Sequence, residues 1–368
     1  MSRFFDLYKT EVEALGGVHN AHLHLDRAHT LEDGFVDAGR VRVLESSSIS
    51  LKSKHALLAT VHEGPAFTDA DMRRRLDRVT AELVAAQTTL ADTMVDVTND
   101  RVQLTALERV MDFARSRADE ITIRAAAYTP LGFRKGDNAT WDLFERGVAQ
   151  ADFIGSLPEA DDIDDYPDHI GFEEHCSRML DLARRYGKML HVHTDQRNEP
   201  GECGTERLIA EMRKCPAMAA PDGSPLVWAV HVVSPSTYDE DRFRAFTDAL
   251  LDCNIGIISC PSAAIGMRQL RPVMSPTYNS IPRLLELAAA GVHIRLGSDN
   301  IADICSPSTT ADMRDEILVL SAALRYFQPR ILAKFAAGVP LDADDRAEVS
   351  AHLAQNDKEI SKVVGGAR

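Results

Sequence analysis

Histidines occupy alternate positions at two places in this sequence. His22 and His24 end one apolar segment, and His191 and His193 end another. Alternate residues of a β-strand point to the same side, so each pair can direct two imidazoles toward one point. Imidazole is a good ligand for Zn²⁺ and Fe²⁺. An isolated pair of this kind also occurs on protein surfaces by chance, so other ligands must accompany it for the pattern to predict a metal site.

Two further residues with metal-binding or acid–base side chains stand at the ends of apolar segments. His231 ends the segment Trp228–His231, and Asp299 follows Leu296 and Gly297. In a barrel of alternating strands and helices, catalytic groups lie at the carboxyl ends of the strands. Chance burial would more often leave one core histidine than four strand ends with such side chains. The pattern therefore predicts one site that gathers residues from strands one, five, six and eight.

The elements that would position these residues are short apolar segments separated by longer amphipathic ones. Apolar residues three and four apart predict helices at Asp71–Gln87 and Phe172–Tyr186. Eight such strands alternating with helices predict a single α/β domain over residues 1–368, a (β/α)₈ TIM barrel at about 18–330 with a helical tail at about 331–368. An open doubly wound sheet is the alternative. The predicted strands are Gly17–His24, Leu90–Val97, Glu120–Tyr128, Asp152–Ser156, Lys188–His193, Leu226–Val232, Ile255–Ser259 and His293–Gly297.

Composition narrows the class of protein. The 368 residues include 41 Lys and Arg against 56 Asp and Glu, a net charge of −15, with 45% hydrophobic residues. The apolar content excludes a mainly disordered chain, and the negative charge argues against a nucleic-acid partner. The six cysteines are scattered, which favours a reducing cytoplasm. No apolar stretch approaches the length of a membrane span or the core of a signal peptide. The sequence therefore predicts a cytoplasmic protein that does not bind membranes. The acidic segment Glu159–Asp165 is predicted to be a solvated loop; the alternative is a loop near the barrel mouth.

From about Val18 to Pro307, the order of the strand-end residues resembles the amidohydrolase superfamily. Within it, three segments resemble the cytosine deaminase-like branch, which includes cytosine deaminase and N-isopropylammelide isopropylaminohydrolase. These segments are His22–Arg27, Thr93–Val97 and Gly297–Asp303. Most of that branch adds a flanking β-sandwich from both termini, whereas the closing strands are not evident here. We therefore expect a bare barrel, or a chain that has lost its terminal segments.

The resemblance implies a role for each strand-end residue. One divalent metal ion would be bound, with Zn²⁺ as the first expectation and Fe²⁺ or Mn²⁺ as alternatives, and its ligands would be His22, His24, His193 and Asp299. His231 would lie beside the attacking water, and Asp299 would also accept a proton from it. The fourth strand lacks the lysine that bridges two metals in binuclear members, which favours one metal. His191 is expected to be structural, and it becomes the ligand if the register is shifted by one pair.

Several positions differ from the branch. Gln196 stands where cytosine deaminases have a proton-transferring glutamate, so Asp195 is the alternative acid. Asn300 replaces a second aspartate, and Pro130 replaces a glutamine that reads the base, which makes cytosine an unexpected substrate. Arg27 could pair with a carbonyl or carboxylate of the substrate, or it could be a surface or ion-pair residue. Arg27, Gln196 and Asn300 are therefore the expected substrate-binding residues. Seven other histidines are expected to be structural or exposed: His29, His55, His62, His169, His175, His293 and His352.

The sequence predicts an enzyme of the deaminase type. A metal-activated water would remove ammonia or a substituted amine from a small nitrogen heterocycle. The first alternative is hydrolysis of a cyclic amide or another non-peptide C–N bond by the same residues. The second is a non-catalytic barrel that binds a metal and a small ligand, because Gln196 and Asn300 remove two titratable groups. A small molecule is the expected partner, and related enzymes assemble, so a homo-oligomer is compatible with this interpretation.

Overall fold

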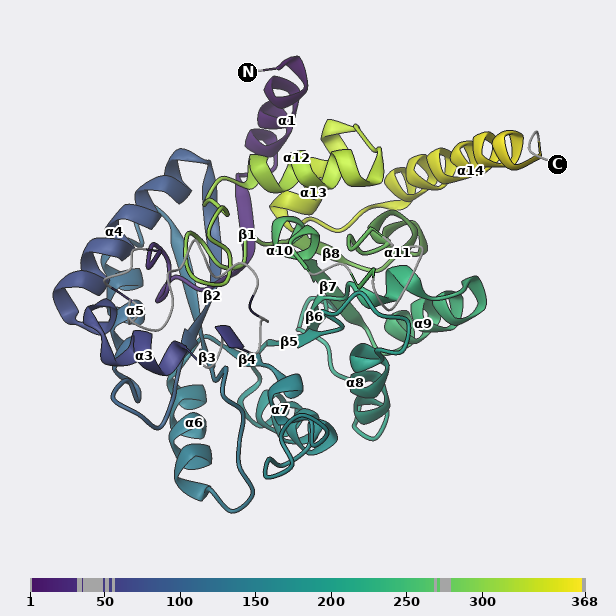
Figure 1. Ribbon diagram of the computed structural model, residues 1–368. Coiled ribbons are helices and arrows are strands. Elements are labelled where there is room, and N and C mark those ends of the chain that lie inside the picture. The colour runs from purple at the N-terminus through teal and green to yellow at the C-terminus, as the bar shows by residue number, and fades with distance from the viewer. Residues whose placement is uncertain are drawn as a thin grey trace.

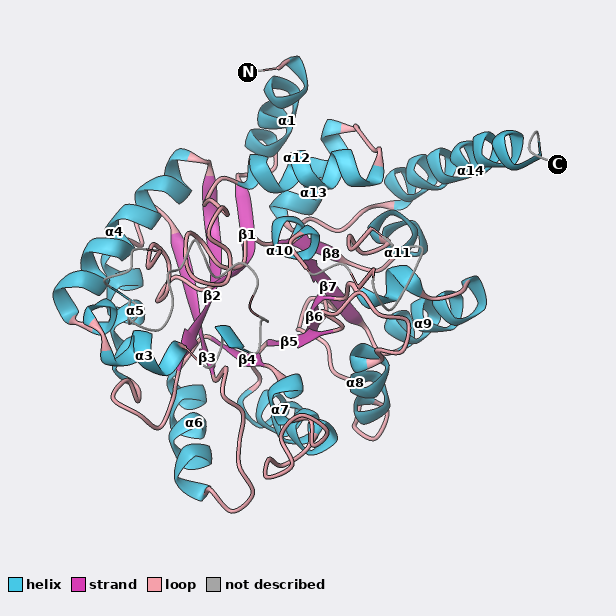
Figure 2. Ribbon diagram, in the orientation of Figure 1, coloured by secondary structure: helices cyan, strands magenta, loops and turns pink. Residues whose placement is uncertain are grey.

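A computed structural model describes residues 2–31, 57–267 and 279–365, together with residues 35, 49, 53, 54, 270 and 271. Eight parallel strands form one sheet in the order β1 to β8. A bridge between Leu23 and Asp299 joins the end of the sheet to β1 and closes the barrel, which confirms the predicted (β/α)₈ fold and excludes the open sheet (Figure 2). The strands are β1 Val18–Leu23, β2 Thr88–Asp96, β3 Thr122–Tyr128, β4 Phe153–Ser156, β5 Leu190–Thr194, β6 Val227–His231, β7 Ile255–Ser259 and β8 Ile294–Leu296.

Helices form a ring around the strands, as Figure 1 shows. The helix α7, Phe172–Tyr186, illustrates why these segments are helical: acidic residues occupy its first turn and arginines its last, as the helix dipole favours, and Gly187 ends it with a φ of 61°. The others are α1 Arg3–Ala14, α3 Leu58–Glu63, α4 Asp69–Ala85, α5 Thr105–Ser116, α6 Asn138–Gln150, α8 Gly204–Met212, α9 Glu240–Asp252, α10 Pro261–Ile265, α11 Leu284–Ala290, α12 Met313–Leu324, α13 Pro329–Ala337 and α14 Ala343–Gly365, with 3₁₀ turns η3 Pro65–Phe67, η4 Pro158–Asp161 and η5 Ser234–Thr237.

The C-terminal helices complete the cover of the barrel. The helix α13 packs against β1, β8 and α1, so the ring of helices extends to Ala337. The helix α14 packs against α11, and its far end projects away from the barrel (Figure 1). Among the described residues, the eight barrel strands form the one sheet, and no strands of a flanking β-sandwich are present. No helix among the described residues combines the length and apolar character needed to span a bilayer.

Candidate metal centre and active site

Four side chains predicted from the sequence to bind a metal lie together at the carboxyl ends of β1, β5 and β8. The ring nitrogens of His22, His24 and His193 that face the centre lie within 4.8 Å of one another, and all three residues are buried. Nε2 of His193 is 3.1 Å from Nε2 of His22. Oδ1 of Asp299 is 3.3 Å from Nε2 of His24 and 3.7 Å from Nε2 of His22.

These distances fit a single tetrahedral cation. Zinc–nitrogen bonds of 2.0–2.1 Å at tetrahedral angles place neighbouring ligand atoms about 3.3 Å apart. Three of the six separations among the ring nitrogens and the carboxylate oxygen, 3.1, 3.3 and 3.7 Å, fall around that value, and the histidine nitrogens all lie within 4.8 Å of one another. Three imidazoles and one carboxylate are also a donor set that suits Zn²⁺ and other first-row divalent metals.

Hydrogen bonds from the outer side orient two of the imidazoles. Nδ1 of His193 donates to the backbone oxygen of Ser156 at 2.9 Å, so the proton is on Nδ1 and Nε2 offers its lone pair to the centre. The Arg27 guanidinium donates to Nδ1 of His24 at 2.5 Å. Because a guanidinium has no acceptor, the His24 proton lies on Nε2, and a cation bound there would displace it.

The backbone turns sharply where the strands end. Asp195, His231 and Asp299 have φ values of 58°, 76° and 59°, in the left-handed region that non-glycine residues rarely adopt. Such conformations cost about 1 kcal/mol or more each and concentrate at functional sites. The backbone N–H of Asp299 donates to the oxygen of His22 at 2.9 Å, which secures its turn against β1. The turns at His231 and Asp299 therefore help to direct their side chains toward the barrel axis.

Electrostatics favour the neutral form of His22, His193 and His231 and the ionised form of Asp299. Burial lowers the pKa of His22 and His193 well below the usual value, and neighbouring imidazoles lower it further. Burial also lowers the pKa of His231. Burial opposes ionisation of Asp299, but its hydrogen bond to His24 and the surrounding imidazoles hold its pKa well below the usual range. Neutral imidazole and carboxylate are the protonation states that bind metals.

The rings of His231 and Tyr128 also lie beside these side chains. The His231 ring centre is 5.4 Å from that of His193 and 5.9 Å from that of His22, and Nδ1 of His231 has no hydrogen-bond partner among the described residues. The ring centre of Tyr128, at the end of β3, lies 5.4 Å from the ring centres of both His24 and His193. Tyr128 ends a strand predicted from the sequence, and that position is the signal that could have identified it as a site residue.

Arg27 is buried beside the centre, with only 3% of its surface exposed. Its Nε lies 3.6 Å from Oδ2 of Asp96, whereas neither Nε nor Nη1 has a hydrogen-bond partner among the described residues. Asp96 also bonds Nε2 of His62 at 3.1 Å, and Nδ1 of His62 bonds Asp100 at 2.7 Å. Arg27 is therefore not a surface residue: it belongs to a buried chain of alternating charges that reaches His24, a candidate metal ligand.

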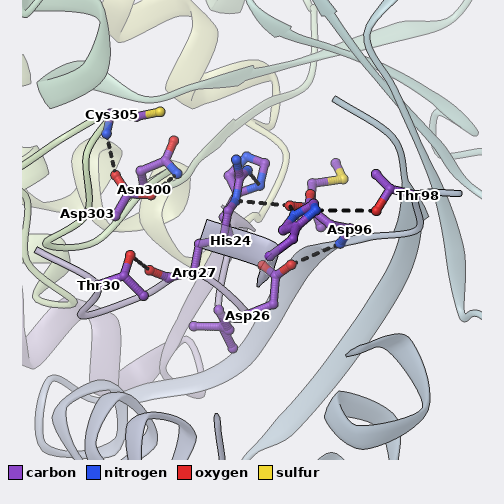
Figure 3. A network of polar contacts seen from close by, with 12 residues as sticks. His24, Asp26, Arg27, Thr30, Asp96, Thr98, Asn300, Asp303 and Cys305 are labelled. Atoms are coloured by element: carbon purple, nitrogen blue, oxygen red, sulfur yellow. Dashed lines mark hydrogen bonds and ion pairs between the residues drawn. The ribbon is translucent and has the colours of Figure 1, made fainter. Parts of the chain in front are cut away.

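Asn300 lies on the other side of His24 from Asp96 (Figure 3). Its amide donates to Oδ2 of Asp303 at 2.5 Å, and Oδ1 of Asp303 accepts from the backbone N–H of Cys305 at 2.7 Å. Burial raises the pKa of Asp303 above the usual value. The segment after β8 thus places buried polar groups close enough to Arg27 for Asp303 to interact with its charge.

Asp195 is held differently from what a proton donor at the centre requires. Its Oδ1 accepts from the N–H of Gly204 at 2.6 Å, and its Oδ2 accepts from the N–H of Thr205 at 2.9 Å and from the Thr205 hydroxyl. Both oxygens therefore bind the first turn of α8, an arrangement that caps the helix. The prediction that Asp195 is the acid does not fit these contacts. A strand-end aspartate followed closely by a helix is the signal that the sequence reasoning overlooked.

Gln196 directs its amide to a residue from the acidic segment. Its Nε2 donates to Oε2 of Glu159 at 2.9 Å. Asp161 is fully buried, whereas Asp164 and Asp165 are exposed. The prediction of a solvated loop is therefore correct for the second half of Glu159–Asp165 and wrong for the first half, where η4 follows β4 at the barrel mouth. A run of acidic residues along a loop carries no signal for which half folds inward.

The other histidines are mainly structural. His191 packs on Phe153 with ring centres 4.6 Å apart, and its ring centre is 6.3 Å from that of His22. Burial lowers the pKa of His191 to about 3, and the cluster that fits a metal contains His193 instead. His62, predicted to be structural or exposed, is buried between two carboxylates, and His55 lies outside the described residues.

Comparisons with known proteins find similar sequences and structures. No family model matches the sequence. The chain is 26% identical over 282 residues to an uncharacterized protein of Haemophilus influenzae, covering 76% of this chain and 93% of that protein. It is 24% identical over 237 residues to a pterin deaminase of Rhizobium rhizogenes, covering 64% of this chain and 51% of that protein. The chain thus spans about half the length of the pterin deaminase.

Similar solved structures share the barrel. A 5-methylcytosine deaminase from Klebsiella pneumoniae aligns with a TM-score of 0.73 and 22% identity, covering 91% of this chain and 75% of that one. The chain resembles the cytosine deaminase-like amidohydrolases. N-isopropylammelide isopropylaminohydrolase from Burkholderia multivorans aligns with a TM-score of 0.61 and 20% identity, covering 91% and 82%. Atrazine chlorohydrolase from Arthrobacter aurescens, complexed with zinc, aligns with a TM-score of 0.54 and 14% identity, covering 88% and 71%.

Proposed function

We propose that this protein is a metal-dependent hydrolase that removes ammonia or a substituted amine from a small nitrogen heterocycle. The observation that carries the proposal is the convergence of His22, His24, His193 and Asp299, from three separate strand ends, at the spacing of one cation's ligands. The similarity to a pterin deaminase, a 5-methylcytosine deaminase and an isopropylaminohydrolase supports the C–N bond as the target.

The cofactor we propose is one divalent ion, with Zn²⁺ first and Fe²⁺ or Mn²⁺ as alternatives. Among the described residues, His22, His24 and His193 form the one such cluster, with Asp299 beside it, which supports one ion; β4, Phe153–Ser156, carries no lysine that could bridge a second. The zinc in atrazine chlorohydrolase supports the choice of metal. When bound, such an ion lowers the pKa of water toward about 7 and so provides hydroxide at neutral pH.

Asp299 and His231 are the residues we assign to the attacking water. The ionised Asp299 carboxylate can accept a proton from that water, because its low pKa keeps it deprotonated until the water approaches. His231 is neutral and has an unpartnered Nδ1, so its ring can bond to the water or to the substrate oxygen. Asp195, which caps α8, takes no part in this scheme.

Arg27 and Asn300 are the residues we assign to the substrate. Arg27 has two N–H-bearing nitrogens, Nε and Nη1, that are buried without an acceptor, and leaving such groups unbonded is costly. A ring carbonyl oxygen would satisfy them. Because Asp96 lies 3.6 Å away, a neutral carbonyl suits this site better than an anionic group. Asn300 would contact the same edge of the ring. Gln196 contributes to the site indirectly, because its amide donates a hydrogen bond to the Glu159 carboxyl group.

The test combines metal analysis with a screen for released amine. Purified protein should contain about one divalent ion per chain and release ammonia or an alkylamine from one or more aminated, carbonyl-bearing pyrimidines, purines, pterins or triazines. Asp299→Asn should abolish release, whereas Asp112→Asn, an exposed aspartate on α5, should not. Metal without release from this panel, but with hydrolysis of cyclic amides, would replace the proposed reaction by its closest alternative. Metal with neither activity would favour the binding barrel, and absence of metal after metal-replete purification would overturn the proposal.

A further inference from the structure

Removal of an amine needs a proton donor as well as a nucleophile. An amide anion is a poor leaving group, so the nitrogen must gain a proton as the C–N bond breaks. Asp299 can accept a proton from water, but Asp195 is bound by three donors of α8, and the Gln196 amide does not titrate. The proposed function therefore requires an acid that none of the residues assigned so far supplies.

Glu159 lies at the same end of the barrel as the candidate metal ligands. It is the third residue after Ser156, whose backbone oxygen accepts the hydrogen bond from His193, and Gln196 is the third residue after His193. Because β4 and β5 are paired, with Ser156 opposite Val192, both residues extend beyond the same edge of the barrel. The Gln196 amide donates to Oε2 of Glu159 at 2.9 Å. The carboxyl group is thus attached to the rim beside a metal ligand.

The segment that carries Glu159 is firmly anchored. The buried Asp161 carboxylate, two residues along η4, bonds His175 at 2.6 Å and His169 at 2.8 Å, and it accepts from the N–H of Phe133 at 2.6 Å. His175 in turn bonds the hydroxyl of Ser156 at 2.9 Å. These contacts tie η4 to the end of β4, so the position of Glu159 depends on a rigid support and not on a free loop.

The two oxygens of the Glu159 carboxyl group differ. Oε2 accepts from the Gln196 amide, whereas Oε1 is almost inaccessible to solvent and has no hydrogen-bond partner among the described residues. The neighbouring Glu202 has a different environment: its Oε2 accepts from the N–H of Arg197 at 2.8 Å and from the Ser234 hydroxyl. Of the two carboxyl groups, Glu202 has the donors that favour a carboxylate, and Glu159 has the free oxygen that can carry a proton.

Three charged groups face Glu159: Glu202 and Asp195 repel a negative charge on it, and Arg197 attracts one. Arg197 is shared, because its Nη2 also bonds Asp165 at 3.0 Å and its Nε is 3.7 Å from Glu202. Burial, followed by repulsion from Glu202 and Asp195, raises the pKa of Glu159 well above the usual value. Burial and Asp195 raise the pKa of Glu202 to about 7. Both shifts favour the protonated form of these carboxyl groups.

We propose that Glu159 is the catalytic acid of this enzyme and that Gln196 is the positioning residue that holds it. Water adds its oxygen to the ring carbon. The C–N bond then breaks and its electron pair stays on the nitrogen, which takes a proton from Oε1 of Glu159. The resulting Glu159 carboxylate is reprotonated by the proton released from the water. No oxidant or further reactant is needed. The proposal rests on the proposed function, and the experiments below separate the failure of one from the failure of the other.

The first experiment measures kcat and KM against pH for the best substrate of the amine-release screen. Glu159→Gln should lower kcat by about 100-fold or more with a smaller change in KM. It should also remove the decline in kcat on the alkaline side, because that decline reports loss of the acid's proton. Glu202→Gln removes a repelling charge, so it should shift that decline to lower pH while the reaction persists. Glu174→Gln, an exposed glutamate on α7, is the matched control and should change neither. A Glu159→Gln enzyme with wild-type kcat and pH profile would overturn the assignment.

The second experiment needs no substrate. Infrared difference spectra of the metal-loaded protein between about pH 6 and about pH 9 should contain the band of a protonated carboxyl group that Glu159→Gln removes and Glu174→Gln retains. Metal content and melting temperature of the variants show whether the fold is intact. If the band is present and no amine is released from any probe, the proposed function fails while the protonated Glu159 stands. If amine is released and the band is unaffected by Glu159→Gln, the inference about Glu159 fails alone.

Discussion

The His62 ion pairs should make stability depend on pH. His62 is completely buried, and its two ring nitrogens bond Asp96 at 3.1 Å and Asp100 at 2.7 Å. Burial alone would lower the pKa of His62, but the two carboxylates outweigh it and raise the pKa from 6.5 to about 9. That difference corresponds to about 3 kcal/mol at 1.36 kcal/mol per pKa unit. The interaction joins α3 to the end of β2, beside Arg27.

The sign follows from which state binds the proton more tightly. The folded protein holds the His62 proton with the higher pKa, so the stabilisation is fully present below about pH 6.5 and is lost as the pH rises through about 9. We expect His62→Gln to reduce the free energy of unfolding by about 3 kcal/mol near pH 6 and by under about 1 kcal/mol near pH 10. Other groups titrate in this range, but they cancel in the difference between variant and wild type.

Urea unfolding of both proteins at the two pH values measures this difference. His352→Gln is the control, because its ring lies half-exposed against Tyr326 and contacts no carboxylate in the described structure. A loss of stability in His62→Gln that is equal at both pH values would refute the reasoning, since it would show that His62 contributes by packing and neutral hydrogen bonds alone.

Three further predictions concern the metal centre. The double variant His22→Ala/His24→Ala should lose bound metal, measured by elemental analysis, while its far-ultraviolet circular dichroism stays like that of the wild type, because the barrel core lies below the site; stoichiometric metal in it would contradict the ligand assignment. Gly297→Ala should weaken metal affinity. A Cβ at this position would lie 2.7 Å from Cβ of His22 and 2.8 Å from its backbone oxygen, so β1 must shift to admit it. Unchanged affinity in a competition titration with a chelator would show that the strands adapt. Asp195→Ala should lower stability by about 1 kcal/mol through loss of the α8 cap, with metal content unchanged; a stable variant with abolished turnover would restore Asp195 as a catalytic residue.

Local chemistry in the sequence determined the barrel and the set of side chains at its centre. Strand ends are readable because a strand repeats every two residues, so His22 and His24 must share a side, and a histidine or aspartate after a short apolar segment must lie at its carboxyl end. Seven of the eight predicted strands differ from the observed ones by one or two residues at one or both ends, and Ile255–Ser259 agrees at both.

The tertiary structure decided which polar residues beyond the strand ends turn inward. Asp195 and Gln196 are adjacent in the sequence, yet one caps α8 and the other holds Glu159. The acidic segment reads as uniformly solvated, but its first half is buried by contacts with His169 and His175. Such outcomes depend on which loops of neighbouring strands meet at the barrel mouth. Hydrogen bonds between residues 37 apart, such as that of Glu159 with Gln196, leave no periodic trace in the sequence, because each partner's environment is created only when the strands pair.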